Sequence, residues 1–395
     1  MKSKSELLYN FICAYPTYLM QYRRFGRTNL NLSVFSLGTM RYLADRETAQ
    51  KTIEAAIALG INHIETAQGY GQSELYLGEA LKQGIDRTQL YITTKITPTA
   101  DAAAMEQAIE KSLQRLGLDY VDCLAIHGLN TPEYLDWVCS PHGSMQAVRS
   151  AQAAGKIRHI GFSTHGSLGL IQAAIATDQF DFVNLHYTYF QQRNAPAISL
   201  ATQQDMGVFI ISPADKGGLL YTPPQKLLDR CAPLLPLHLN YRFLLSDPRI
   251  TTLSVGAADP TELELPLAVA DQTGPLTEME QAAIVRLEQT QTETLGGDRC
   301  QQCFACLPCP EEINIPEVLR LRNLSVAFEM ENFGQYRYRM FENAGHWFPG
   351  RKANRCTDCG DCLPRCPEYL AIPDLLRDAH DRLNGSPRPR LWESI

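Results

Sequence analysis

Eight of the 12 cysteines in this 395-residue chain lie between positions 300 and 366, where they form two short runs. The second run, CTDCGDCLPRCP at 356–367, has the C-x2-C-x2-C-x3-C-P spacing that is typical of bacterial 4Fe-4S sites. The first run, CQQCFACLPCP at 300–310, has two residues instead of three before its fourth cysteine. In such a motif three cysteines hold one cluster, and the fourth, which a proline follows, binds the other cluster.

The spacing therefore predicts two 4Fe-4S clusters whose fourth ligands are exchanged between the runs. One cluster would use Cys300, Cys303, Cys306 and Cys366, and the other would use Cys356, Cys359, Cys362 and Cys309. Two structural zinc sites with four thiolates each are the alternative, because both runs also contain C-x2-C pairs. Three cysteines in direct succession and the final proline favour iron–sulfur chemistry over zinc. A single cluster is a further alternative, whereas a disulfide framework is typical of short secreted chains.

A second group of reactive residues lies close to the ends of three predicted strands, and it consists of Glu65, Tyr70, Lys95 and His127. A phenol, an ammonium and an imidazole that converge would suit proton transfer to a carbonyl oxygen. A close Lys95 cation would lower the pKa of Tyr70 from its usual value of about 10. Glu65 would keep Lys95 charged and in place, and His127 would orient the carbonyl. Each residue alone has a simpler structural explanation, but the four together favour an active site.

A repeated alternation of strands and helices must position this group. Helical spacing recurs at 46–59, 101–116 and 143–155 between short β-branched and aromatic runs. Strands that alternate with helices pair in parallel, and eight units in about 250 residues favour a (β/α)8 TIM barrel, with an open doubly wound sheet as the alternative. Barrel enzymes carry their reactive residues at the C-terminal ends of the strands. The eight predicted strands are 33–38, 62–66, 91–96, 120–127, 157–163, 180–186, 207–212 and 251–256.

The same pattern predicts the domain boundaries. A hairpin at 22–33 would close the floor of the barrel, and the Leu-Gly-Gly linker at 295–297 would end the barrel region. A small, mainly helical, ferredoxin-like iron–sulfur domain would follow, with a helix at 315–340. The predicted domains are an N-terminal extension at 1–19, the barrel at 20–294, the iron–sulfur domain at 295–375 and a C-terminal tail at 376–395.

The composition of the chain argues against nucleic-acid and membrane partners and against export. The 36 basic and 43 acidic residues give a net charge of −7 without any basic block, which argues against a nucleic-acid partner. The sequence contains no run of about 18 uninterrupted apolar residues, so it predicts no membrane span. The first 20 residues lack the apolar core and small-residue cleavage site of an export signal, so a cytoplasmic location is expected.

Several longer segments resemble the aldo/keto reductase superfamily, and most closely its branch with a C-terminal ferredoxin-type 4Fe-4S domain. They are FSLGTM at 35–40, ETAQGYGQSE at 65–74, ITTK at 92–95, RLGLDYVDCLAIH at 115–127 and GKIRHIGFSTH at 155–165. The resemblance implies a (β/α)8 reductase that uses NADP or NAD and has no metal in the barrel. The family's catalytic Asp, Tyr, Lys and His correspond to Glu65, Tyr70, Lys95 and His127, so that Glu65 departs from the pattern by one methylene group.

The resemblance also implies a nucleotide site. Ser163 and Asn184 would contact the carboxamide of the nicotinamide. The loop after the seventh strand would follow the pyrophosphate, with Ser212, Lys216 and Gly217. The adenosine end would lie near Gly256, Ala257, Asp259 and Glu262. Many relatives that prefer NADP have a basic residue in this last region, whereas this chain has Ala-Ala-Asp at 257–259, so the sequence does not choose between NADP and NAD.

The sequence thus predicts an NAD(P)H-dependent oxidoreductase that interconverts a carbonyl compound and an alcohol. Its partners would be a small-molecule carbonyl substrate and a redox protein, with no nucleic acid and no membrane. The clusters would serve electron transfer, redox sensing or structure. The alternative is a degenerate barrel that acts as a scaffold for an electron-transfer unit. Aromatic residues near the barrel mouth would cover the nicotinamide, meet the substrate or pack on the cysteine-rich unit, and they are Tyr42, Tyr187, Tyr189 and Phe190.

Overall fold

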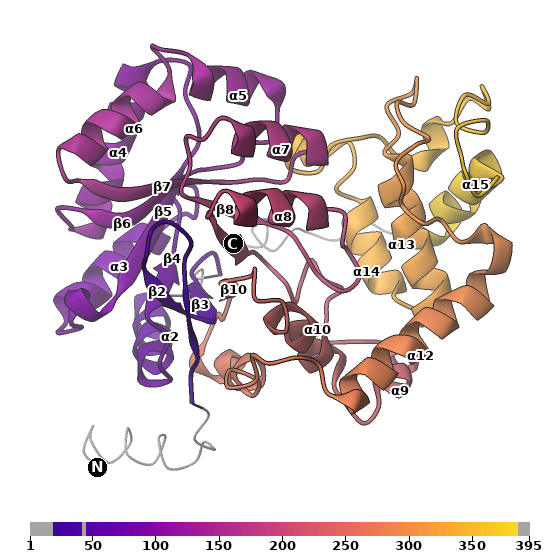
Figure 1. Cartoon of the computed structure of the whole chain (residues 1–395), viewed down its shortest axis with the longest axis horizontal. Coiled ribbons are helices and arrows are strands. Elements are labelled where there is room, and N and C mark those ends of the chain that lie inside the picture. Colours follow the sequence, from indigo (N-terminus) through magenta and orange to yellow (C-terminus); the bar gives the residue numbers. More distant parts are fainter. Residues whose placement is uncertain (1–18, 42–44, 386–395) are drawn as a thin grey trace.

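Eight parallel strands form a closed barrel in the computed structural model, which describes residues 19–41 and 45–385 (Figure 1). The barrel closes because β10 pairs with β3 on one side and with β9 on the other, which excludes an open sheet. All eight predicted strands are present. They are β3 (Phe35–Gly38), β4 (His63–Glu65), β5 (Tyr91–Ile96), β6 (Val121–Ile126), β7 (Ile157–Ser163), β8 (Phe182–Leu185), β9 (Gly207–Ile210) and β10 (Thr252–Val255).

Helices follow the strands and cover the outside of the barrel (Figure 1). Within the described residues, no helix has both the length and the apolar character that a membrane span requires. The helices of this part are α2 (Arg46–Ala58), α3 (Ser73–Lys82), α4 (Ala102–Leu116), α5 (Pro132–Cys139), α6 (Ser144–Ala153), α7 (Leu168–Ala176), α8 (Ala195–Gln203), α9 (Gln225–Cys231), α10 (Pro236–Leu245), α11 (Glu264–Leu267) and α12 (Glu278–Leu295).

Helix α4 shows how the sequence specifies these elements. The Asp101 side chain accepts a hydrogen bond from the backbone N–H of Ala104 and so caps the start of the helix. Gly117 ends the helix in the left-handed conformation, with φ 64°, which glycine adopts without steric cost. Met105 and Ile109 recur at helical spacing and are buried, so one face of α4 packs on the barrel.

A hairpin of β1 (Tyr22–Arg24) and β2 (Asn31–Ser33) closes the floor of the barrel, as the sequence predicts. Its turn inserts the fully buried Phe25 ring, whose centroid lies 5.2 Å from that of Phe182 on β8. Gly207 at the start of β9 makes room for this ring, because a Cβ atom there would lie 2.2 Å from Phe25. The bottom layer of the barrel core therefore depends on a residue from outside the eight strands.

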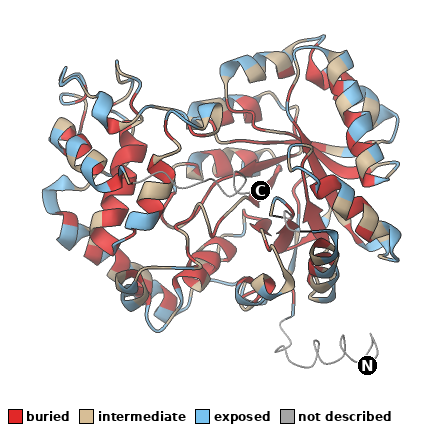
Figure 2. Ribbon diagram, turned by 180° about the vertical axis from the view of Figure 1, so that it is seen from behind, coloured by how far each residue is buried: buried red, intermediate tan, exposed pale blue. Residues whose placement is uncertain are grey.

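The C-terminal unit consists of α13 (Ile315–Phe328), α14 (Glu331–Tyr338) and α15 (Ile372–Leu383), together with the cysteine-rich loops. The predicted helix at 315–340 is interrupted, because Glu329 ends α13 in the left-handed conformation, with φ 60°. Helix α13 is buried almost all round, since α12, α14 and α15 pack against it (Figure 2). Buried residues of the barrel and of this unit form one continuous apolar cluster. The unit is therefore not an independently folded appendage.

The iron–sulfur unit extends beyond its predicted C-terminal boundary. Helix α15 crosses the expected end of the iron–sulfur domain at 375, and its buried Leu376 and Leu383 belong to the core of the unit. Those residues are not part of a tail, because they complete the packing around α13. Except for Leu19, the predicted extension at 1–19 lies outside the described residues, as do the last ten residues of the predicted tail.

We expect Phe25→Ala to lower the free energy of unfolding by about 3–5 kcal/mol, because it leaves a cavity in the closed bottom layer. Urea denaturation monitored by circular dichroism measures this change. Met279→Ala on α12 is the control, since Met279 is 53% exposed and its loss should change stability by less than about 0.5 kcal/mol. Equal stability losses in the two variants would contradict the role given to the hairpin.

Candidate functional site

The four residues predicted to be catalytic converge at the C-terminal end of the barrel. Lys95, near the end of β5, lies at their centre and is only 1% exposed. Its ammonium group donates hydrogen bonds to the Tyr70 hydroxyl at 3.2 Å and to the backbone oxygen of Thr66 at 3.0 Å. It also forms a buried ion pair with Glu65 at the end of β4. The His127 ring stands almost perpendicular to the Tyr70 ring, with the two centroids 5.6 Å apart.

The site has room for the Glu65 side chain, which is one methylene group longer than the expected aspartate. One carboxylate oxygen pairs with Lys95, and the other accepts a hydrogen bond of 3.0 Å from the Ser254 hydroxyl on β10. Gly38 provides the necessary space, because a Cβ atom there would lie 2.6 Å from the Ser254 oxygen and 3.0 Å from Glu65. Glu65 thus holds Lys95 against Tyr70, and the departure from aspartate does not break the arrangement.

The pKa of Tyr70 differs from the value expected from the sequence. Burial raises the pKa of Tyr70 above its usual value, and the Lys95 charge opposes this rise without cancelling it. The prediction of a lowered Tyr70 pKa was therefore wrong, because it ignored the loss of solvent around the phenol. Burial alone would lower the pKa of Lys95, but Glu65 and Tyr70 raise it, so Lys95 stays charged. Burial and Lys95 lower the pKa of His127 to about 3, which keeps this imidazole neutral.

The expected carboxamide contacts lie opposite each other on neighbouring strands, since Ser163 on β7 pairs with Asn184 on β8. The Ser163 hydroxyl accepts a hydrogen bond of 3.1 Å from the Gly128 backbone N–H. Asn184 is completely buried, yet among the described residues neither its amide nitrogen nor its amide oxygen has a hydrogen-bond partner. A buried amide without partners is costly. A ligand carboxamide, which offers one donor group and one acceptor, would satisfy both atoms.

The loop after β9 carries the residues expected to meet the pyrophosphate. Ser212 adopts a left-handed conformation, with φ 49°, and its carbonyl accepts a hydrogen bond of 3.1 Å from the Lys216 N–H. Gly217 is required in this tight turn, because a Cβ atom would lie 1.9 Å from the Pro213 carbonyl oxygen. Burial and the nearby Arg337 of α14 lower the pKa of Lys216 to about 7. A bound anion would therefore stabilise the charged form of this lysine.

At the expected adenosine end, Gly256, Ala257 and Asp259 follow β10, and Glu262 accepts a hydrogen bond of 2.9 Å from the backbone of Ala258. Glu262 also pairs with Arg41, which in addition donates a hydrogen bond of 3.0 Å to the Gly256 carbonyl. Residues 257–262 contain no basic residue, but Arg41 brings a cation to the same place from the loop after β3. Sequence reasoning missed it because the two segments are more than 200 residues apart.

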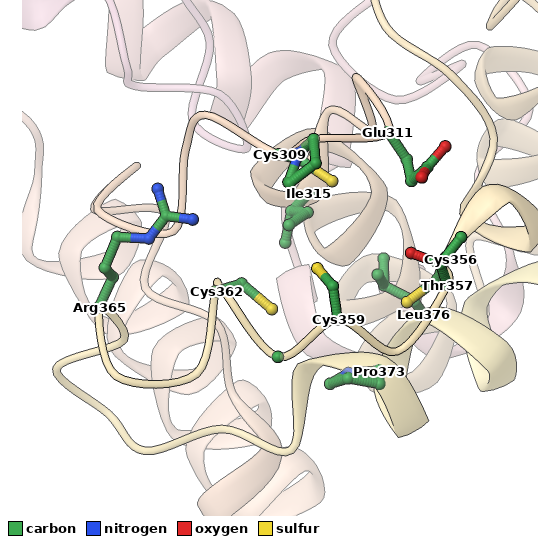
Figure 3. A pocket seen from close by; sticks show the side chains of 12 residues that line it. Cys309, Glu311, Ile315, Cys356, Thr357, Cys359, Cys362, Arg365, Pro373 and Leu376 are labelled. Atoms are coloured by element: carbon green, nitrogen blue, oxygen red, sulfur yellow. The ribbon is translucent and has the colours of Figure 1, made fainter.

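The eight cysteines of the two runs line two small cavities, in the partition that their spacing predicts. One cavity is lined by Cys300, Cys303, Cys306 and Cys366. The other is lined by Cys309, Cys356, Cys359 and Cys362, whose side chains surround a common space (Figure 3). No three His, Cys, Asp or Glu side chains of the described residues come close enough to hold a single metal ion. Two sets of four soft thiolate donors around separate cavities fit the chemistry of two 4Fe-4S clusters.

The two cysteine runs fold alike despite their different lengths. Gln302 and Asp358, each just before the second cysteine, have φ values of 56° and 58°. Phe304 and Gly360, each just after it, also have positive values of 63° and 80°. Left-handed residues turn the backbone tightly, so each loop curves around its cavity. The missing residue of the first run, which lies before the fourth cysteine, does not alter this loop.

Sequence reasoning also missed a contribution of the C-terminal unit to the barrel mouth. Trp347 packs against His127, with ring centroids 5.1 Å apart. Of the aromatic candidates, Phe190 packs on Phe328 of α13 at 5.6 Å, whereas Tyr187 and Tyr189 pack on Phe243 of α10. Tyr42 lies outside the described residues. No local pattern marks Trp347, because the barrel residues that its ring contacts, His127 and His165, are more than 180 residues away in the sequence.

Comparison with known proteins agrees with this geometry. Residues 35–230 match the aldo/keto reductase family, and residues 299–372 match a 4Fe-4S dicluster domain. The barrel is an aldo/keto reductase domain. It belongs to an oxidoreductase that also carries an iron–sulfur domain, and this match favours clusters over zinc at the cysteine runs.

Several similar proteins are described as oxidoreductases or aldo-keto reductases. An uncharacterized oxidoreductase of Bacillus subtilis is 24% identical over an alignment of 281 residues, and the match covers 62% of this chain and 89% of the relative. An aldo-keto reductase of Mycobacterium tuberculosis is 34% identical over an alignment of 160 residues, and the match covers 39% of this chain and 54% of the relative. The holo form of an aldo-keto reductase from Bacillus halodurans superposes with a TM-score of 0.60. It has 22% sequence identity and covers 68% of this chain and 96% of its own, a likeness that shows the fold.

We expect Glu65→Gln to destabilise the aldo/keto reductase domain by about 3–5 kcal/mol, because the buried Lys95 ammonium would lose its carboxylate partner. Urea denaturation of the holoprotein measures the loss. Glu110→Gln is the matched control, because the Glu110–Lys156 pair is exposed and should contribute less than about 1 kcal/mol. A similar, small effect in both variants would show that the buried pair is not required for folding.

Iron content tests the exchange of ligands between the cysteine runs. The double variant Cys309→Ala/Cys356→Ala removes two ligands of one predicted cluster, so about half of the iron should remain after anaerobic purification. Cys309→Ala/Cys366→Ala damages both predicted clusters and should remove most of the iron. The reverse order of iron contents would contradict the assignment of Cys309 and Cys366.

Proposed function

We propose that the chain is an NAD(P)H-dependent oxidoreductase that interconverts an aldehyde or ketone and an alcohol by hydride transfer. The observation that carries this proposal is the Tyr70 hydroxyl, which Lys95 holds beside His127 at the barrel mouth. The unpartnered amide of Asn184 supports a nicotinamide nucleotide in the same mouth. NADP and NAD both fit these contacts. The small-molecule substrate would reach this mouth from solvent.

The residues of the site suit a reduction. A bound nicotinamide supplies the hydride. Tyr70 remains a protonated phenol at neutral pH, since burial raises its pKa, and it can therefore donate a proton to the carbonyl oxygen. The neighbouring Lys95 ammonium stabilises the phenolate that this donation leaves. His127 is neutral and can hydrogen-bond the carbonyl without competing for the proton. Glu65 keeps Lys95 charged and positioned.

Two features of the structure count against the scaffold alternative. Glu65 reaches Lys95 in spite of its longer side chain, and Arg41 supplies a cation beside Glu262 at the expected adenosine end. The arrangement of Tyr70, Lys95 and His127 has no evident purpose in an inert scaffold. The oxidoreductase is therefore the function that the geometry supports best.

We propose two 4Fe-4S clusters for the C-terminal unit, one in each cysteine-lined cavity. Cys303 and Cys359 are exposed, so each cluster would approach the surface, which suits electron exchange with a redox protein. Redox sensing and a purely structural role are the other proposed uses. Eight thiolate ligands are best maintained in a reducing compartment such as the cytoplasm. The proposed domains are the barrel up to residue 294 and the iron–sulfur unit from 295 through α15.

Tyr70→Phe tests the proposal. The variant keeps the ring but loses the acidic proton, so kcat for carbonyl reduction should fall by about 100-fold or more. An anaerobic fluorescence titration with NADPH and with NADH should show the same affinities as the original protein. Tyr120→Phe is the matched control, because Tyr120 precedes β6 at the opposite end of the barrel. Undiminished carbonyl reduction by Tyr70→Phe, or the absence of binding of either nucleotide by the iron-loaded protein, would overturn the proposal.

A further inference from the structure

A short turn of the iron–sulfur unit, Gly345–Trp347, reaches the mouth of the barrel. The Trp347 ring packs edge-on against two histidines of the barrel. Its centroid lies 5.1 Å from that of His127, at an interplanar angle of 64°, and 5.3 Å from that of His165, at 80°. Trp347 therefore touches one residue of the catalytic group directly, although it belongs to a different domain.

The barrel is shaped to receive this side chain. Gly128, directly after His127, has φ 70°, and a Cβ atom there would lie 2.5 Å from the Trp347 ring. The adjacent His346 shares a hydrogen bond of 3.1 Å with the Asn130 side chain, and its ring packs on Tyr134 at 5.3 Å. Three features thus fix the position of the turn: the absence of a Cβ atom at Gly128, the hydrogen bond between His346 and Asn130, and the packing of His346 on Tyr134.

The neighbouring histidine is also held firmly. His165 Nδ1 lies 2.9 Å from His186 Nε2, and the other ring nitrogen of His186 lies 3.0 Å from the Ile211 carbonyl oxygen. His165 is therefore held in place on one side of Trp347. Trp347 itself is only half-buried, so these contacts do not enclose it completely.

Trp347 and Tyr70 are both ring neighbours of His127, and this arrangement places Trp347 close to the expected position of the substrate. His127 has Tyr70 as one ring neighbour, at 5.6 Å, and Trp347 as another, at 5.1 Å. A carbonyl oxygen that accepts a proton from Tyr70 lies beside His127, so the substituents of that carbonyl have Trp347 within reach. An indole ring offers a flat apolar surface, on which another ring packs favourably.

We propose that Trp347 of the iron–sulfur unit forms one wall of the substrate pocket and selects carbonyl compounds that carry an aromatic ring. This inference rests on the proposed carbonyl reduction and goes further by naming a substrate class and a specificity residue outside the barrel. It also gives the iron–sulfur unit a part in substrate recognition, independent of any electron transfer by its clusters.

Anaerobic steady-state kinetics of the holoprotein test the proposal with 4-nitrobenzaldehyde and butanal as probes. Trp347→Ala should raise KM for 4-nitrobenzaldehyde about tenfold, which is the size expected for the loss of one aromatic contact and its apolar burial. KM for butanal and the affinity for the nucleotide should change less than twofold. Trp347→Phe should recover most of the discrimination, because it restores a ring. Trp137→Ala is the matched control, since Trp137 packs on Tyr134 and not on His127.

A binding measurement separates failure of this inference from failure of the proposed reaction. Isothermal titration calorimetry with 4-nitrobenzyl alcohol and the protein–NADPH complex reports ring binding without turnover. The dissociation constant should rise about tenfold in Trp347→Ala and stay unchanged in Trp137→Ala. The inference is overturned if the original protein shows no binding, or if Trp347→Ala binds the alcohol normally. Equal increases of KM for both aldehydes would also overturn it, since they would show that Trp347 only docks the two domains.

Discussion

The buried ion pair between Lys95 and Glu65 is the interaction on which the site depends. Two charges this deep in a protein cost several kcal/mol each unless they are paired and hydrogen-bonded. The surroundings of the pair meet this requirement. Thr66 and Tyr70 accept hydrogen bonds from Lys95, and Ser254 donates one to Glu65. These partners come from the ends of different strands, so only the closed barrel brings them together.

Much of the fold follows from local patterns. The eight strands are apolar runs between helical segments. Parallel strands that are buried on both faces have continuous apolar sequences, so this pattern predicts them. The partition of the cysteines also follows from local spacing, since Cys366 lines a cavity with the first run and Cys309 lines one with the second. The predicted catalytic group could be placed because the ends of consecutive parallel strands meet at one end of a barrel.

The parts that sequence reasoning missed depend on contacts between distant segments. Arg41 meets Glu262 and Trp347 meets His127 only after the chain has folded. The raised pKa of Tyr70 depends on how much solvent the surrounding elements exclude, which a motif does not encode. The prediction placed residues from 376 onward in a tail, whereas helix α15 continues to Leu383 and its apolar residues pack on the core of the unit.

The arrangement of the cysteines has a consequence for the order in which the protein is made. The ribosome completes β10 and α12 of the barrel before it reaches Cys300. Because Cys366 lines the first cavity, the first cluster cannot have its full set of ligands until the second run has been synthesised. Trp347 lies between the two runs. The turn that reaches the barrel mouth is therefore synthesised after all eight barrel strands and just before the second run, which completes both sets of cluster ligands.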